Sequence, residues 1–274
     1  MKTLLTMIIV VSLTLLLSPS SQANSLEPCA TKQCKEYFDA YKIYTRRGHS
    51  EAMATLAELY FAGYGTAQNT KLALKWFRRA AKFGSASSQY KAAVIYLREP
   101  EYLDVDKGIN YLEKSAKKGF PAASYMLGKI YYGSSIAEAD HELADKYLSQ
   151  AFTEGYPRTQ GFIQQLIEID GLSKLPQLTQ MYQNSLIKTD TSTTKFPTGE
   201  METIEVTAPD ITAYFNTQLA RLNNSIPDTS SGTGSKIAGR TCADMWGCSG
   251  EYDEQKQRDF SFSDWGKIAA IFYP

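Results

Sequence analysis

Four glycines recur along the chain at nearly constant intervals, and this period constrains the fold more than any other feature. Gly48, Gly84, Gly119 and Gly155 are separated by 36, 35 and 36 residues. A fixed period of this length is typical of helical repeat arrays, in which each repeat is one helix pair. A pair of about 35 residues is too small to bury its own apolar face, so neighbouring pairs must stack to complete the core.

The residues before each glycine predict a helix that ends there. A bulky pair lies eight and seven positions before the glycine. These pairs are Trp76-Phe77, Tyr111-Leu112 and Tyr147-Leu148, and the match weakens to Ala40-Tyr41 before the first glycine. A glycine just past a helix end can adopt the left-handed conformation that closes the helix. Basic residues before it, such as Lys82, favour the negative end of the helix dipole.

A second helical pattern follows each of the first three glycines. A small residue lies nine positions after the glycine, and an apolar pair lies eleven and twelve positions after it. The small residues are Ala57, Ala93 and Gly128, and the pairs are Leu59-Tyr60, Ile95-Tyr96 and Ile130-Tyr131. A small side chain lets a neighbouring helix approach closely, and the apolar residues form a stripe at helical spacing. Each repeat is therefore predicted to be a pair of helices.

The motif resembles that of the Sel1-like repeat family. The residues that carry the resemblance are Ala52, Leu56-Ala57, Leu59-Tyr60, Gly63-Tyr64-Gly65, Leu72-Ala73, Trp76-Phe77, Ala80-Ala81 and Gly84. The resemblance covers about residues 36–168, and it implies an all-α, right-handed superhelical solenoid of Sel1-like helix pairs. The second unit departs from the pattern, because Arg98-Glu99-Pro100 stands where the loop glycines are expected.

Sel1-like proteins commonly act as scaffolds for protein complexes. The resemblance therefore implies a non-enzymatic adaptor that binds a protein or peptide partner on a concave surface lined mainly by the first helix of each pair. The candidate contact residues are Tyr60, Tyr64, Tyr90, Tyr125 and Tyr132. Tyrosines at helical spacing are also typical of a core, so core packing stays open as the alternative for each of them.

The first 23 residues have the layout of a secretory signal peptide. Lys2 precedes an apolar run from Leu4 to Leu17, and Ser21 and Ala23 form a small-residue cleavage site. The apolar run is too short to span about 30 Å of hydrocarbon, so we expect cleavage near Ala23 and no stable membrane insertion afterwards. This layout favours a bacterial periplasmic protein with its partner in the cell envelope. A secreted eukaryotic protein is the open alternative.

Four cysteines form two local pairs, Cys29 with Cys34 and Cys242 with Cys248. Exported chains meet oxidising conditions, so structural disulfides are expected, although three connectivities are possible. Neither pair has the two-residue spacing of a thiol oxidoreductase.

The composition changes after the repeats and divides the chain. We expect a repeat domain at 24–186, a linker at 187–200 and a small mixed or partly disordered module at 201–274. Within that module, 201–208 (METIEVTA) is a strand candidate because Ile204 and Val206 alternate with polar residues. This stretch resembles the opening of the plug domain of TonB-dependent receptors. An accessory factor of an outer-membrane transporter is therefore an alternative function.

Two further elements of the C-terminal module carry predictions. Residues 210–223 are predicted to form an amphipathic helix, capped by Asp210. Its apolar stripe consists of Ile211, Phe215, Leu219 and Leu222. The segment 242–248 is predicted to be a disulfide-closed loop that presents Trp246 as an aromatic anchor for a partner.

The sequence offers little chemistry. His49 and His141 are the only histidines and lie in different repeats, so surface or capping roles are expected and no metal site is predicted. No catalytic or cofactor motif is present, and 29 basic residues balance 29 acidic ones, which does not predict a nucleic-acid partner. Some secreted members of the family bind or hydrolyse β-lactams and carry a cysteine pair in most repeats. Residues 35–241 contain no cysteine, which leaves a cell-wall or β-lactam hydrolase as the weaker alternative.

Overall fold

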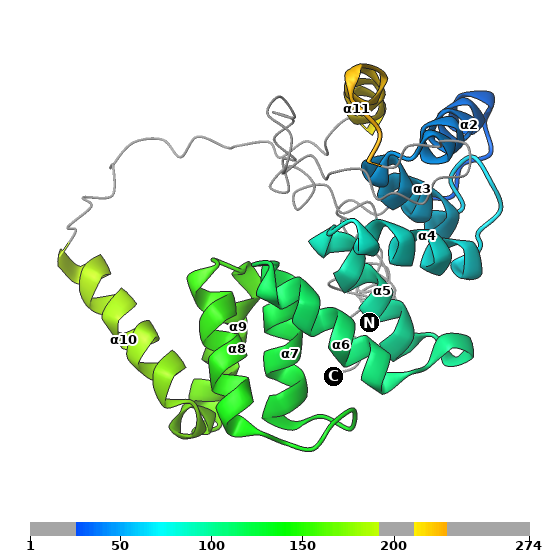
Figure 1. The fold of residues 1–274 in the computed structure, drawn as a ribbon. Helices are drawn as coiled ribbons and strands as arrows, with labels where there is room; N and C mark the ends of the chain where they lie inside the picture. Colours follow the sequence, from blue (N-terminus) through cyan, green and yellow to red (C-terminus); the bar gives the residue numbers. More distant parts are fainter. Residues whose placement is uncertain (1–25, 192–210, 229–274) are drawn as a thin grey trace, which may run out of the picture.

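The computed structural model describes residues 26–191 and 211–228. This part of the chain is helical, with an isolated β-bridge between Cys29 and Tyr64. The α-helices are α2 (Lys32–Arg47), α3 (Ser50–Ala62), α4 (Thr70–Lys82), α5 (Ala86–Arg98), α6 (Val105–Lys117), α7 (Pro121–Gly133), α8 (His141–Thr153), α9 (Pro157–Glu168), α10 (Pro176–Thr191) and α11 (Ile211–Asn224). Figure 1 shows the helices stacked one after another along the chain, which confirms the predicted all-α solenoid.

The period seen in the sequence is the period of the helix pairs. Three pairs, α3–α4, α5–α6 and α7–α8, follow one another without interruption. The glycines Gly48, Gly84, Gly119 and Gly155 follow the ends of α2, α4, α6 and α8 with φ angles of 101°, 94°, 74° and 70°. These angles lie in the left-handed region that glycine adopts most readily, which confirms their predicted role in ending the helices.

A recurring cap joins the two helices of each pair, and it was not recognised in the sequence. The residue before the second helix accepts a hydrogen bond through its side chain from a backbone N–H one turn later. These bonds are Asn69 to Leu72 (2.9 Å), Asp104 to Lys107 (3.0 Å) and Asp140 to Leu143 (3.0 Å). The N–H of each cap residue donates in turn to the end of the first helix. The acceptors are the carbonyls of Tyr60, Tyr96 and Tyr131, at 2.8, 2.9 and 2.8 Å.

The core runs between the pairs as the stacking principle requires. One large side chain from each second helix, at the same position in every repeat, is completely buried. These residues are Phe77, Leu112 and Leu148. The small column predicted from the sequence lies opposite, with Ala57 and Ala93 also at 0% exposure. In the third repeat, a Cβ atom on Gly128 would come within 2.5 Å of Leu148 Cγ, so the column sets how closely the helices approach.

The array departs from regularity at two places. In the second unit, where the loop glycines are missing, a short 3₁₀ helix at Pro100–Tyr102 makes the connection. After the third pair, the buried carboxylate of Asp145 accepts hydrogen bonds of 2.8 Å from the backbone N–H groups of Gln177 and Leu178, which holds the start of α10. The helix α10 ends at Thr191, within the range 187–200 predicted to be a linker. The remainder of that range lies outside the described residues.

The close approach at Gly128 has a measurable consequence. The Gly128→Ala substitution improves helix propensity, but its new methyl group would collide with the completely buried Leu148. We expect a net loss of about 1–3 kcal/mol in the free energy of unfolding. The matched control is Gly161→Ala in α9, where an added Cβ meets nothing within 4 Å and a small gain is expected from helix propensity alone. Urea denaturation measures the free energy of unfolding of both variants. Equal changes in this free energy for the two variants would refute the packing role of Gly128.

Candidate functional site

The helix α2 corresponds to the second helix of a pair. In the described residues, no first helix of that pair precedes it. It ends at Gly48, as α4, α6 and α8 end at the equivalent glycines. A terminal unit without its partner leaves an apolar face that needs a cover. Figure 1 shows α11 beside α2 and α3, at the opposite end of the molecule from α10, the helix that precedes it in the described sequence. A helix from the distal part of the chain therefore covers the first unit.

An aromatic side chain anchors α11 on this surface. The Phe215 ring is completely buried, and its centroid lies 5.0 Å from that of Tyr37, 5.6 Å from that of Tyr41 and 5.5 Å from that of Tyr64. Leu222, two turns later, is 2% exposed. The helix and its apolar stripe were predicted from the sequence, and both are confirmed. We call the surface formed by Tyr37, Tyr41, His49, Glu51, Thr55 and Tyr64 the α11 seat.

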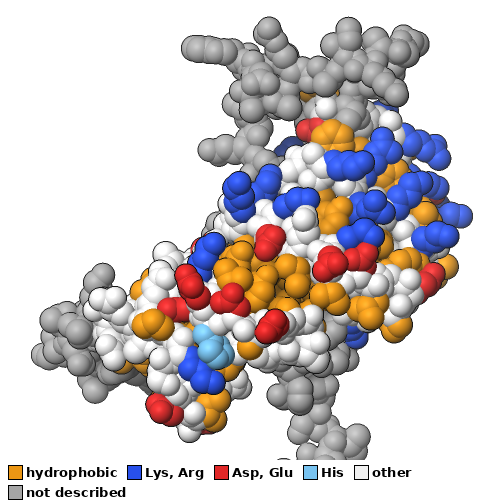
Figure 2. All heavy atoms as spheres, turned by 60° about the horizontal axis from the view of Figure 1, so that its bottom comes forward, with side chains coloured by type: hydrophobic (Ala, Val, Ile, Leu, Met, Phe, Trp, Pro, Cys, Tyr) orange, Lys and Arg blue, Asp and Glu red, His pale blue; other side chains and the backbone are white. Residues whose placement is uncertain are grey.

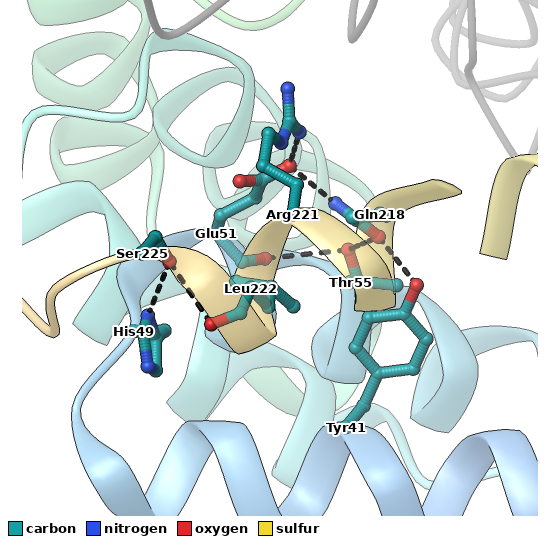
Figure 3. A network of polar contacts seen from close by, with 8 residues as sticks. All are labelled: Tyr41, His49, Glu51, Thr55, Gln218, Arg221, Leu222 and Ser225. Carbon is teal, nitrogen blue, oxygen red and sulfur yellow. Dashed lines mark hydrogen bonds and ion pairs between the residues drawn. The ribbon is translucent and has the colours of Figure 1, made fainter. Parts of the chain in front are cut away.

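A buried glutamine fixes the register of α11 in the seat (Figure 3). Gln218 is 2% exposed, and its Oε1 atom accepts hydrogen bonds from Tyr41 (2.6 Å) and from Thr55 (3.0 Å). Its Nε2 atom donates to Glu51 Oε1 at 2.7 Å, and Arg221 forms an ion pair with the same carboxylate. A buried polar group left without a partner costs about 1–3 kcal/mol, so these contacts select a matching helix.

Further polar contacts follow α11 along its length. Tyr37 donates to Asn216 Oδ1 at 2.9 Å and Tyr44 donates to Asn223 Oδ1 at 3.3 Å. Beyond the helix, the Ser50 N–H donates to Asp228 Oδ2 at 2.6 Å. Hydrogen bonds thus continue from the second turn of α11 to the segment that follows it.

Burial alters the pKa of three titratable groups in the seat, Tyr41, Tyr64 and His49, and it raises the pKa of both tyrosines. It raises the pKa of Tyr41 well above its usual value, with smaller contributions from Tyr214 and Tyr37, so the phenol remains a hydrogen-bond donor. Burial also lowers the pKa of His49, an effect that Asp228 opposes and Arg47 reinforces. His49 occupies the cap position before α3, but its side chain makes no cap bond; instead Nδ1 lies 3.2 Å from Ser225 Oγ. Burial therefore favours the neutral imidazole beside Ser225.

The tyrosines predicted to contact a partner have different environments. Tyr64 belongs to the seat, and Tyr60 lies half-buried with its ring centroid 5.1 Å from that of Phe38. Tyr90 is 3% exposed and packs against Phe120, so its ring belongs to the core and is not presented to a partner, which corrects that assignment.

Two more of these tyrosines lie at the far end of the array. Tyr125 and Tyr132 are half-buried around Phe162, with ring centroids 6.1 and 5.7 Å from it. Burial raises the pKa of Tyr125 to about 12, with Tyr156 adding to the shift. Trp246 lies outside the described residues, as do 201–208 and the pair Cys242 and Cys248.

The other predicted chemistry is sparse in the described residues. Cys29 and Cys34 form a disulfide with Cα atoms 6.0 Å apart. His141 lies half-buried at the start of α8, with its ring centroid 5.6 Å from that of Tyr132. Residues 26–191 and 211–228 contain no group of three or more metal-ligating side chains, and none of their helices is long and apolar enough to cross a membrane.

The Sel1 repeat model matches residues 50–85, 86–120 and 121–156. Residues 50–156 thus match three consecutive Sel1 repeats. The three matches coincide with the pairs α3–α4, α5–α6 and α7–α8. Sel1 repeats generally mediate protein–protein interactions, and proteins built from them are typically non-catalytic scaffolds. The helices α2, α9, α10 and α11 lie outside the matched ranges, so the α11 seat combines one repeat helix with an element that precedes the repeats.

The similar proteins match only part of this chain. The chain is 31% identical over 118 residues to chitin synthase regulatory factor 2 of Schizosaccharomyces pombe, covering 41% of this chain and 23% of that protein. It is 29% identical over 94 residues to the putative sel1-like repeat-containing protein L21 of Acanthamoeba polyphaga mimivirus, covering 34% and 17%. The chain thus spans less than a quarter of the length of these curated relatives.

Two solved structures are also similar in part. A Sel1 repeat protein from Oxalobacter formigenes is 24% identical with a TM-score of 0.45, over 48% of this chain and 54% of that one. The protective antigen c5321 of uropathogenic Escherichia coli strains is 18% identical with a TM-score of 0.46, over 57% and 34%.

The anchoring role of Phe215 is testable. Phe215→Ala removes a completely buried ring, which typically costs about 3–5 kcal/mol, and the loss falls on the docking of α11. We expect hydrogen exchange to accelerate in 211–224 and at the seat while α5 to α8 keep their protection. Thr217→Ala, on the exposed side of the same helix, is the control and should leave exchange unchanged. Equal acceleration across all repeats would show that Phe215 supports global stability instead.

Proposed function

We propose that this chain is a non-enzymatic scaffold that binds helical segments of a protein partner. The observation that carries this proposal is the docking of α11, a helix far away in the sequence, on the α11 seat. An isolated helix of 14 residues is marginal in water, so α11 depends on the surface that receives it. Binding of an amphipathic helix through a few spaced anchors is a common mode of peptide recognition.

The seat supplies affinity and selectivity through different residues. The aromatic rings around Phe215 give apolar area, which favours any helix with a large side chain at that position. The contacts of Gln218 are stricter, because an apolar residue there would leave the Tyr41 and Thr55 hydroxyl groups without these hydrogen bonds. A helix with an aromatic residue, a glutamine three positions later and a leucine seven positions later is therefore the expected ligand type.

The remaining array offers further contact residues for a longer partner. Tyr60, Tyr125 and Tyr132 are half-buried, so each residue retains some exposed surface. We assign them to the partner surface together with Tyr64 of the seat. No residue is assigned a catalytic role, since the contacts of the seat are those of recognition.

Binding in trans tests the proposal. In the variant Phe215→Ala/Gln218→Ala/Leu222→Ala the seat loses its own ligand, and a labelled peptide of residues 209–228 should bind it with a dissociation constant in the micromolar range. The wild-type chain should bind the peptide at least tenfold more weakly, because its own α11 competes at an effective concentration of about millimolar. Fluorescence anisotropy measures both.

The control is the same peptide with Phe215→Ala, which should bind neither chain. Failure of the unmodified peptide to bind the triple variant, with circular dichroism showing intact repeats, would refute recognition of helices by the seat.

We further propose that the chain is exported, to the periplasm or beyond, and meets its partner in the cell envelope. The support is the signal-peptide layout of residues 1–23 and the disulfide between Cys29 and Cys34, which suits an oxidising compartment. Expression in a bacterium should yield a mature chain that begins at Asn24. Intact mass and N-terminal sequencing check this, and a chain that retains Met1 to Ala23 would contradict export.

A further inference from the structure

The exposed face of α4 carries a surplus of positive charge in a chain that is neutral overall. No Asp or Glu occurs between residues 59 and 98. The α4 face consists of five exposed basic residues, Lys71, Lys75, Arg78, Arg79 and Lys82. Figure 2 shows Lys and Arg side chains crowding the right-hand side of the molecule, where Figure 1 places the first repeats.

The other repeats show that the fold does not require this charge. Each repeat has an equivalent second helix, with the same completely buried position facing the core. On α6 the five equivalent residues are Asp106, Asn110, Glu113, Lys114 and Lys117, with a net charge of zero. On α8 they are Glu142, Lys146, Ser149, Gln150 and Thr153, again with a net charge of zero. The second helix of a repeat thus forms in an equivalent packing environment without the surplus of positive charge.

The surplus also opposes folding. Lys71 and Lys75 are four positions apart, as are Lys75 and Arg79, and like charges at this spacing destabilise a helix. Within the described part of the chain, no salt bridge involves the five residues of the α4 face. Arg78 also makes a small contribution in the next repeat, where it opposes the rise that Asp104 causes in the pKa of Lys107. This surplus of positive charge destabilises the helix and is not needed for the fold. It therefore indicates a ligand of opposite charge.

An aromatic ring lies among these cations. Trp76 is half-buried, with Lys75 Nζ 5.7 Å and Arg79 Cζ 5.5 Å from its ring centroid. Tryptophan and arginine are the residues that most often dominate the energy of protein interfaces. The α4 face therefore offers an apolar anchor flanked by charge rather than charge alone.

We propose that the α4 face binds an acidic helical segment of a partner protein. The inference deepens the proposed scaffold function but uses a surface distinct from the α11 seat. The cations extend over about 16 Å along α4, which matches three turns of a helix with Glu or Asp at every fourth position. The adjoining α6 exposes Asp106 and Glu113, which would repel a broad polyanion such as a lipid surface. The charge thus favours a narrow acidic ligand.

The test uses a labelled 16-residue helical peptide with five glutamates on one face. Its affinity for the wild-type chain should fall steeply between 50 and 200 mM NaCl, since it is carried by charge. The variant Lys75→Gln/Arg78→Gln/Arg79→Gln should bind it at least tenfold more weakly. Its melting temperature should be unchanged or higher, because like-charge repulsion has been removed.

The control variant Lys35→Gln/Lys146→Gln/Lys174→Gln loses the same charge from exposed residues elsewhere and should bind within twofold of wild type. An equal loss in both variants, or in neither, would overturn the proposal. Tighter binding of the wild-type chain to a 16-nucleotide single strand or to phosphatidylglycerol vesicles than to the peptide would also overturn it. Binding of peptide 209–228 to the vacated seat is independent of α4, so its outcome separates this inference from the proposed function.

Discussion

The structure depends on one constraint, which is that a single helix pair cannot bury its own apolar face. Every repeat must be covered by the next, and Phe77, Leu112 and Leu148 are completely buried because stacking continues past them. The same constraint applies at both ends of the three matched repeats, where other helices of the described residues supply the cover. At the distal end, Asp145 holds α10 in place through two backbone bonds. At the first repeat, the chain returns and supplies α11.

Because α11 packs on α2 and α3, the contacts at this end of the array differ from the contacts between repeats. Between the repeats, small and large apolar side chains pack together, accompanied by separate polar contacts such as the buried Lys91–Glu58 ion pair. In the α11 seat, a buried amide, a carboxylate and two hydroxyl groups are satisfied together around Gln218. Such networks are specific because a partial match leaves buried polar groups without partners. The seat therefore resembles an interface more than a core.

The features that recur in every repeat could be predicted from the sequence. The features that occur once, such as the docking of α11, could not. Gly84 and Gly119 define a period, and Ala93 and Gly128 define a column, because stacking repeats the same requirement in each pair. The helix around Phe215 was also predicted, since its apolar stripe is local. Its docking on α2 was not, because nothing in a local pattern states which distant surface it covers. Gln218 has the sequence character of a solvated residue and is buried only through that docking.

The distance in sequence between α11 and its seat also affects the order of folding. Synthesis proceeds from the N-terminus, and the repeats make contacts between neighbours, so α3 to α8 can assemble as they emerge. The unit formed by α2 and α3 is synthesised before α4 to α10, yet it is completed only when residue 224, the end of α11, has been added. Until then its aromatic face is uncovered. Docking of α11 therefore requires that synthesis has passed residue 224, and a chain that ends before that residue would display the aromatic face.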